Sequence, residues 1–284
     1  MDTHSTLILT CPDQKGLVAR ISYFISQLGG NIIDLDEHAD KEEKMFFIRL
    51  ELDMQDLGIT EKEFGVQFQT LADEIQGTWE IKHSSEKAQV ALFVSKMDHC
   101  LQEILWRHDG GELNGDMKLI VSNHMDLKFI ADRYNIPFHY FPVTRDNKSE
   151  TEAAELELLE KNKIDTIVLA RYMQVLSSDF VKKYPNQIIN IHHSFLPAFI
   201  GANPYRRAFE RGVKLIGATS HYVTEELDEG PIIEQDVMRI THKDSLKDLI
   251  RKGRHLERMV LARALYYHLN NRVLKCGKKT IIFT

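Results

Sequence analysis

The chain has 284 residues, of which 43% are hydrophobic and 27% charged, and its formal net charge is −6. This length accommodates two domains of ordinary size, and the composition is typical of a globular protein. The acidic balance, without a basic cluster, excludes nucleic acid as the main partner. No apolar run approaches the roughly 18 residues of a membrane span, and the amino terminus has no signal core, so we expect a cytoplasmic protein without membrane contact.

The first part of the chain has the predicted order βαββαβ. Apolar residues spaced by three and four predict the helices, and short apolar or alternating runs predict the strands. The predicted strands are 5–11, 31–35, 44–53 and 78–82, and the predicted helices are 17–28 and 64–75. This is the order of a ferredoxin-like fold. A short polar stretch at 84–87 then predicts two domains, 1–85 and 86–284.

Two turns of this first domain carry a further pattern. Residues 12–18 read Pro-Asp-x-x-Gly-Leu-Val, and residues 29–32 read Gly-Gly-Asn-Ile. Together with the βαββαβ order they resemble an ACT domain. The resemblance implies a module that pairs its sheet with that of another subunit, and therefore a homo-oligomer, either a dimer or a tetramer.

The resemblance also implies that an amino acid binds at the subunit interface. Gly16 would let the backbone approach a small ligand, Asp13 could bind its α-amino group, and Asn31 begins the next strand. We therefore expect an effector site at Asp13, Gly16 and Asn31, with glycine or methionine as the effector. A module that serves assembly alone is the alternative.

From residue 90 onward, apolar strands alternate with helices. The predicted strands are 90–94, 118–122, 138–143 and 166–170, and the predicted helices are 101–106, 127–134 and 152–162. This alternation predicts an α/β domain with a doubly wound, mostly parallel sheet. Ligands of such sheets bind beyond the carboxyl ends of the strands, where Ser95, Asn123, Arg171 and His192 fall. An amphipathic pattern over 245–271 predicts a last, packed helix.

An apolar run at 187–191 ends in a cluster of polar residues. The alternation of a strand places Asn190 and His192 on one face. A second predicted strand, 217–223, leads into an acidic loop that supplies Asp228. An amide, an imidazole and a carboxylate can cleave or transfer an acyl group with water or an amine as nucleophile. Each residue alone also fits a structural role, as strand cap, rim histidine or turn aspartate.

Asn190-x-His192 followed by Ser-Phe-Leu-Pro, and His221-Tyr-Val followed by Asp228-x-Gly, resemble the signature of the folate-dependent formyltransferase and hydrolase family. The resemblance covers roughly the last two hundred residues, the usual size of one domain. It implies that Asn190 and His192 stabilise the tetrahedral intermediate at the formyl carbon, that Asp228 shuttles protons, and that His221 orients Asp228 or the water. It further implies a folate site, for which the candidates are Arg171, Met173, Gln174, Val175, Leu176 and Glu225. A packed first helical turn is the alternative for Met173, Val175 and Leu176.

The first strand of the second domain distinguishes members of this family. Transferases have a glycine-rich phosphate loop there, whereas this chain reads Ser-Lys-Met-Asp-His-Cys-Leu at 95–101. The resemblance then implies water as acceptor, hydrolysing 10-formyltetrahydrofolate to formate and tetrahydrofolate. It also implies that the formate supplies purine biosynthesis and that the reaction balances one-carbon pools. The folate is the substrate, and no cofactor is expected. A formyltransferase acting on a small unphosphorylated amine and a folate- and amino-acid-sensing protein without turnover are the alternatives.

The three cysteines, at 11, 100 and 276, are too few and too far apart for a disulfide framework or a zinc ribbon. His99 and Cys100 could form a thiol nucleophile and its base, but neighbours on a helix point about 100° apart, which favours a structural Cys100. We expect no metal. Adjacent strand histidines diverge, and no closely spaced histidine pair is present.

Overall fold

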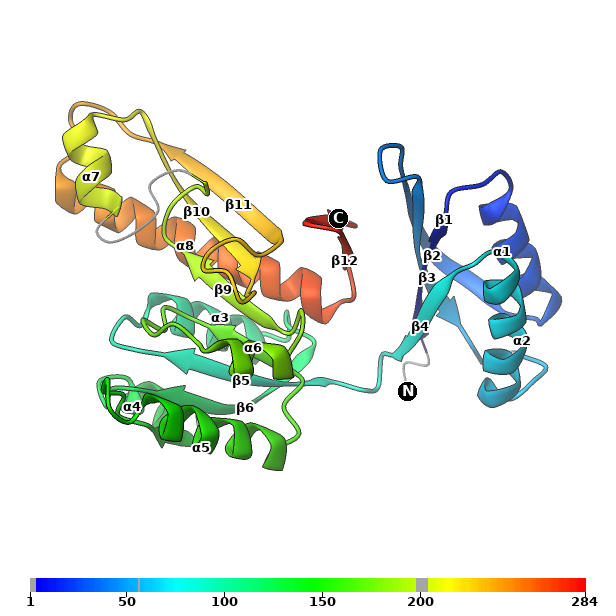
Figure 1. Cartoon of the computed structure of the whole chain (residues 1–284), viewed down its shortest axis with the longest axis horizontal. Coiled ribbons are helices and arrows are strands. Elements are labelled where there is room, and N and C mark those ends of the chain that lie inside the picture. Colours follow the sequence, from blue (N-terminus) through cyan, green and yellow to red (C-terminus); the bar gives the residue numbers. More distant parts are fainter. Residues whose placement is uncertain (1–3, 56, 198–203) are drawn as a thin grey trace. The chain divides into compact units, whose positions relative to one another are not determined.

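The computed structural model describes residues 4–55, 57–197 and 204–284. The chain divides into two compact units (Figure 1). The first contains the residues up to Lys87 together with Asn271–Leu274 and Ile281–Thr284, and the second contains Ala88–Asn270 and Lys275–Thr280. Within the described ranges we find no helix with the length and apolarity that crossing a bilayer requires.

The first unit is an antiparallel sheet with two helices on one face (Figure 1). Its strands are β1 (His4–Pro12), β2 (Asn31–Asp40), β3 (Met45–Asp53) and β4 (Thr78–His83), in the order β2-β3-β1-β4, and its helices are α1 (Leu17–Gln27) and α2 (Glu61–Glu74). Alternate residues of β1 are buried, and Leu7 and Leu9 pack with Phe64 and Phe68 of α2. The predicted ferredoxin-like βαββαβ order is confirmed.

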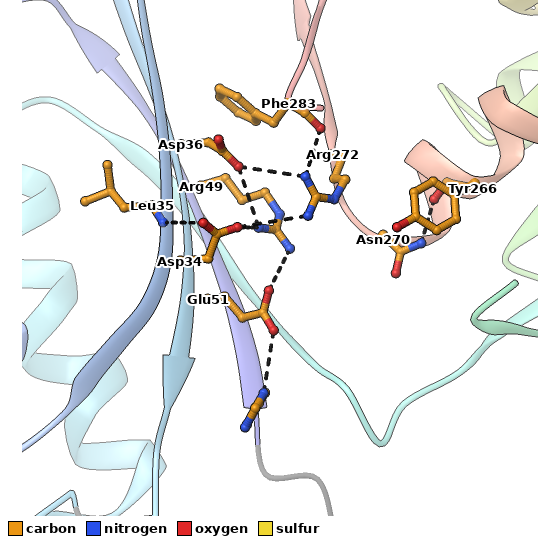
Figure 2. A network of polar contacts seen from close by, with 10 residues as sticks. Asp34, Leu35, Asp36, Arg49, Glu51, Tyr266, Asn270, Arg272 and Phe283 are labelled. Atoms are coloured by element: carbon orange, nitrogen blue, oxygen red, sulfur yellow. Dashed lines mark hydrogen bonds and ion pairs between the residues drawn. The ribbon is translucent and has the colours of Figure 1, made fainter. Parts of the chain in front are cut away.

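A buried arginine organises one end of this sheet. Arg49 of β3 has a side chain only 4% exposed, and an unpaired charge at that depth would cost several kcal/mol. Carboxylates 3.3–3.9 Å away compensate it, and they belong to Asp34, Asp36 and Glu51. Arg272, from the carboxyl-terminal segment, lies 4.0 Å from Asp34 and 3.9 Å from Asp36, and donates to the carbonyl of Phe283 (Figure 2). Its ion pairs hold that segment against β2.

The second unit is built on a seven-stranded sheet of order β11-β10-β9-β8-β5-β6-β7. Five strands run parallel: β5 (Ala88–Val94), β6 (Gly115–Ser122), β7 (Phe138–Tyr140), β8 (Thr166–Leu169) and β9 (Ile188–His192). The last two, β10 (Leu215–Tyr222) and β11 (Ile232–Arg239), are antiparallel to their neighbours. All four residues of β8 are buried, as in a sheet covered on both faces. The predicted α/β, mostly parallel fold is confirmed.

Helices cover this sheet, and a small hairpin follows the last of them. The helices are α3 (His99–Asp109), α4 (Lys128–Tyr134), α5 (Lys148–Lys161), α6 (Ser178–Lys183), α7 (Pro204–Arg211) and α8 (Leu246–Leu269), and the hairpin strands are β12 (Val273–Cys276) and β13 (Lys279–Ile282). Leu159 of α5 and Phe180 of α6 pack on Phe93 of β5 in one core cluster. The long α8 packs on α3, β10 and β11 (Figure 1).

Two predicted segments differ in the structure. The predicted strand 138–143 ends at Tyr140 in the structure. Pro142 follows two residues later, and because proline has no N–H to donate, the edge strand β7 cannot continue through it. The residues from Ala170 to Ser177 form no helix, so the packed helical turn considered for Met173, Val175 and Leu176 is wrong. Side chains of other elements, Ser95 and Glu152, instead hydrogen-bond the backbone of this segment.

Candidate active site

Strands β9 and β10 bring the first two polar groups together. They are antiparallel, with Asn190 directly opposite His221. The Asn190 amide nitrogen lies 3.2 Å from Nε2 of His221, while Nδ1 of that ring lies 2.8 Å from the carbonyl of Tyr222. A proton on Nδ1 satisfies the carbonyl and leaves Nε2 to accept from the amide. His221 therefore orients Asn190.

The loop after β10 delivers the carboxylate. A Cβ on Gly230 would lie 1.7 Å from the carbonyl oxygen of Tyr222, so only glycine permits this close return of the chain. Asp228 adopts a left-handed backbone conformation with φ of 58°, and this turn points its side chain at both histidines. Its Oδ2 lies 3.2 Å from Nδ1 of His192, and its Oδ1 lies 3.7 Å from Nε2 of His221.

His192 is held with one nitrogen free. Its Nδ1 faces Asp228, and its Nε2 is buried without a hydrogen-bond partner among the described residues. Because His192 also lines a cavity, this nitrogen is available to a bound molecule. The hydrogen bond from His192 holds the pKa of Asp228 well below its usual range despite partial burial. Asp228 is therefore an anion at neutral pH, and it accepts a hydrogen bond from Nδ1 of His192.

These groups open into a cavity of about 670 Å³, which is large enough for a small-molecule substrate. One wall is the segment Arg171–Leu176, in which the side chains of Met173 and Val175 are more than half exposed. The loop residues Val223–Glu225 and Leu227 continue that wall. The remaining wall comes from Met97 and His99 near the start of α3, Pro204–Arg206 of α7, and Leu246, Ile250, Arg254 and Glu257 of α8.

The segment from Arg171 to Ser177 is fastened at several points. Arg171 has a left-handed φ of 64°, which turns the chain as it leaves β8. The amide of Met173 donates to Oγ of Ser95 over 3.0 Å, and the hydroxyl of Tyr172 donates to Glu155 over 3.2 Å. Burial raises the pKa of Glu155 to about 7. These contacts hold the segment beside the cavity without a helical hydrogen-bond pattern.

The predicted residues fall into three groups. Asn190, His192, His221 and Asp228 converge, and the predicted folate residues Arg171, Met173, Gln174, Val175, Leu176 and Glu225 line the same cavity. Glu225 also pairs with Lys182 over 3.2 Å and accepts from the hydroxyl of Ser178. Ser95 and Asn123 hydrogen-bond each other beneath the segment and do not line the cavity.

The predicted effector residues lie in the first unit. Gly16 has a φ of 86°, and a Cβ there would meet no atom within 4 Å, so the turn is open. The amide of Asp13 donates to the carbonyl of Lys44 over 2.9 Å, and Asn31 is the exposed first residue of β2. An effector at these residues stays a prediction.

Sequence reasoning missed the residues of α7 and α8 that line the cavity, above all Glu257 and Tyr205. The helical pattern could have indicated Glu257, because it places this carboxylate on the same buried face of α8 as Gly253, Leu256 and Val260. A carboxylate buried there needs a hydrogen-bonding or charged partner. His193 was considered as a core or rim histidine and, with its neighbour His192, as a possible metal ligand. It stacks on His192, with ring centroids 5.4 Å apart, and burial, with the charge of Arg171, lowers its pKa to about 4. It is therefore neutral at neutral pH.

One cluster has the donor atoms of a metal site. His99, Cys100 and Glu257 each place one donor within 4.8 Å of the others. However, His99 and Glu257 already hydrogen-bond over 2.8 Å, and the guanidinium of Arg171 lies 3.3 Å from the same carboxylate. A metal cation would be repelled by that charge, and burial raises the pKa of the Cys100 thiol, so it is neither a ready ligand nor a nucleophile.

Comparison with known proteins identifies the family. Residues 88–265 match the family model described as formyl transferase. The formyltetrahydrofolate deformylase of Synechocystis sp. is 54% identical over 279 residues, which are 98% of each chain. The crystal structure of a formyltetrahydrofolate deformylase from Pseudomonas syringae pv. tomato superposes with a TM-score of 0.96 at 43% identity, covering 100% of this chain and 95% of that one. Glycinamide ribonucleotide transformylase 1 from Symbiobacterium toebii gives a TM-score of 0.65 at 28% identity, over 70% of this chain and 95% of its own. The chain therefore belongs to the formyl transferase family and, within it, to the formyltetrahydrofolate deformylases.

Proposed function

We propose that this chain hydrolyses 10-formyltetrahydrofolate to formate and tetrahydrofolate. The relatives that match nearly the whole chain carry the name of this activity. The observation that carries the proposal is the free Nε2 of His192, buried at the cavity while Nδ1 is tied to an ionised Asp228. In the protonated ring this nitrogen carries a hydrogen, and it can donate to an oxyanion as it forms.

The folate would bind along Arg171–Leu176. The exposed side chains of Met173 and Val175 offer apolar surface to the flat pterin ring, and the backbone of the segment, which forms no helix, would offer N–H and C=O groups to its polar edge. Glu225 is already engaged by Lys182 and Ser178, and would shape the entrance. The formyl group would then lie at the end of β9, beside Asn190 and His192.

In the proposed reaction a water molecule attacks the formyl carbon. Asp228 takes its proton, and the negative charge that develops on the formyl oxygen is shared by the Nε2–H of His192 and one N–H of Asn190, whose other N–H faces His221. Collapse of the intermediate breaks the carbon–nitrogen bond and places a proton on the folate nitrogen, leaving formate. A carboxylate with a lowered pKa is a weak base, but water bonded to the tetrahedral carbon is far more acidic than free water, so a late transfer suffices.

We also propose that residues 1–85 form an ACT-like module and residues 86–284 the catalytic domain, in a homo-oligomer. The ferredoxin-like order of the first unit and its open Gly16 turn support an amino-acid effector such as glycine or methionine near Asp13 and Asn31. Assembly alone is the competing role of the module. The folate remains the partner proposed for the cavity, and the cytoplasm the expected location.

The test of the function is formate release from 10-formyltetrahydrofolate with no amine added. Release of formate with one equivalent of tetrahydrofolate supports the hydrolase. A formyl amide that forms only when an amine is supplied would instead identify a transferase. Folate binding without either product would identify a sensing protein.

A further inference from the structure

A buried carboxylate lies in the wall of the cavity that is formed by α3, α7 and α8. The side chain of Glu257 is only 1% exposed, and both its oxygens are engaged. Oε1 accepts from the hydroxyl of Tyr205 over 2.5 Å, and Oε2 lies 2.8 Å from Nε2 of His99 and 3.3 Å from Nε of Arg171. We call His99, Arg171, Tyr205 and Glu257 the Glu257 cluster.

The Glu257 cluster is built as one rigid piece. A Cβ on Gly253, one turn before Glu257 in α8, would lie 2.1 Å from Cζ of Tyr205, so the tyrosine ring occupies the space that a side chain there would need. The charges of Arg171 and Glu257 compensate each other. Burial acts to raise the pKa of Glu257, but the hydrogen bond from His99 and the charge of Arg171 outweigh it, so the carboxylate stays ionised.

The cluster is also continuous with the catalytic residues. All four of its side chains line the cavity that contains Asn190 and His192. The ring of Tyr205 lies 6.2 Å from that of His193, which in turn stacks on His192. An acceptor that approached the formyl carbon along this wall would therefore have to displace a charge-compensated group of side chains.

We propose that the Glu257 cluster determines the acceptor of the formyl group, by admitting water and turning away amines. This rests on the proposed hydrolysis. An amine brings N–H groups that need an acceptor once they leave water, and both oxygens of Glu257 are already occupied. Arg171 also fills space in the wall and repels an ammonium ion. Water is smaller, and Asp228 alone can orient it.

Releasing Glu257 from its donors should let an amine compete with water. The amine nitrogen would attack the formyl carbon and lose a proton to Asp228, the bond to the folate nitrogen would break, and that nitrogen would be protonated. The products would be a formyl amide and tetrahydrofolate. Arg171→Gly suits the test because its left-handed φ of 64° is favourable for glycine, and it removes both the bulk and the charge.

The experiment measures the ratio of formylglycinamide to formate when 10-formyltetrahydrofolate and a large excess of glycinamide are given to the full-length chain. The wild type should produce formate almost alone. Arg171→Gly should raise the ratio about tenfold or more, the value of a hydrogen bond to a charged acceptor. Because this ratio compares two products of one enzyme, it does not depend on the absolute rate.

Three further variants make the result decisive. Tyr205→Phe frees one oxygen of Glu257 with little change in volume and should also raise the ratio, so it decides the question if Arg171→Gly does not turn over. The double variant Arg171→Gly with Glu257→Gln keeps the space left by the arginine side chain but removes the negative charge of Glu257. Its ratio of formylglycinamide to formate should therefore fall back most of the way to the wild-type value. Arg254→Ala removes a cavity arginine that is not among the ion-pair partners of Glu257, which are His99 and Arg171, and should leave the ratio unchanged.

An unchanged ratio in both Arg171→Gly and Tyr205→Phe, from a wild type that releases formate, would overturn this inference alone. A product ratio that stays raised in Arg171→Gly with Glu257→Gln would also overturn the inference, because the lost volume of the Arg171 side chain would then explain the whole increase. A wild type that releases no formate without an amine would instead remove the proposed function.

Discussion

Replacing Asp228 with asparagine tests the proposed proton transfer most directly. Asparagine has nearly the same shape, and it tolerates the left-handed φ of 58° at this position, so the loop should keep its conformation. The amide oxygen can still accept from Nδ1 of His192, at the 3.2 Å that now separates the two residues. What disappears is the negative charge, and with it both the base for water and the charged partner of His192.

The expected loss follows from those two roles. A positioned general base contributes about a hundredfold to ten-thousandfold, so kcat for formate release should fall at least about a hundredfold. KM should change little, because the predicted folate contacts lie along Arg171–Leu176. Formate release and equilibrium binding of tetrahydrofolate measure the two parts separately.

A matched control lies on the same loop. Glu226→Gln makes the same change of charge at an exposed residue outside the cavity wall, and should keep kcat within about twofold. A turnover of Asp228→Asn within tenfold of the wild type would refute the reasoning, and a proton acceptor other than Asp228 would then be required.

Three other predictions concern metal, pH and the first domain. Exhaustive chelation should leave formate release unchanged, because Arg171 occupies the cation position beside Glu257; loss of activity that zinc restores would contradict this. The pKa of Glu155 is raised from 4.5 to about 7, so its protonated form is favoured in the folded state, and the free energy of unfolding should fall as pH rises from about 4.5 to 7. In urea titrations at several pH values Glu155→Gln should remove this loss, on the order of 2–3 kcal/mol, and equal slopes for both proteins would disprove it. Glycine or methionine should change the rate of formate release severalfold in the wild type and not in Asp13→Ala, since typical coupling energies are about 1–3 kcal/mol; no change of rate and no binding would leave the module an assembly device.

Much of the fold is predictable because its signals are local. The spacing of apolar residues predicts α1 and α2, and the continuous apolar run of β5 predicts a sheet buried on both faces. The end of β7 was harder to place, because the pairing of an edge strand with β6 depends on where Pro142 interrupts its hydrogen bonds. The short strands β12 and β13 were missed, since four residues with no alternating pattern do not stand out from a loop.

The residues proposed to be catalytic were equally visible in the sequence, because strand alternation and one tight loop bring them together. Asn190 and His192 are two residues apart, and the register of β9 with β10 adds His221. The close return at Gly230 adds Asp228. Each step needs only neighbouring segments, so a short motif contains nearly all of the information.

The Glu257 cluster is different in kind. Its members come from α3, the end of β8, α7 and α8, and 158 positions separate His99 from Glu257. No periodicity connects such distant residues. Each of them alone fits an ordinary structural role at a helix end, in a turn or as a single charged residue on the apolar face of a helix. The sequence does show that Glu257, a charged residue, falls on the face of α8 that must be buried. A buried charge requires a partner, so this position predicts that a cation or several donors lie opposite the helix. It does not reveal that these donors also line the cavity that contains Asn190 and His192, because that depends on how four distant segments pack together.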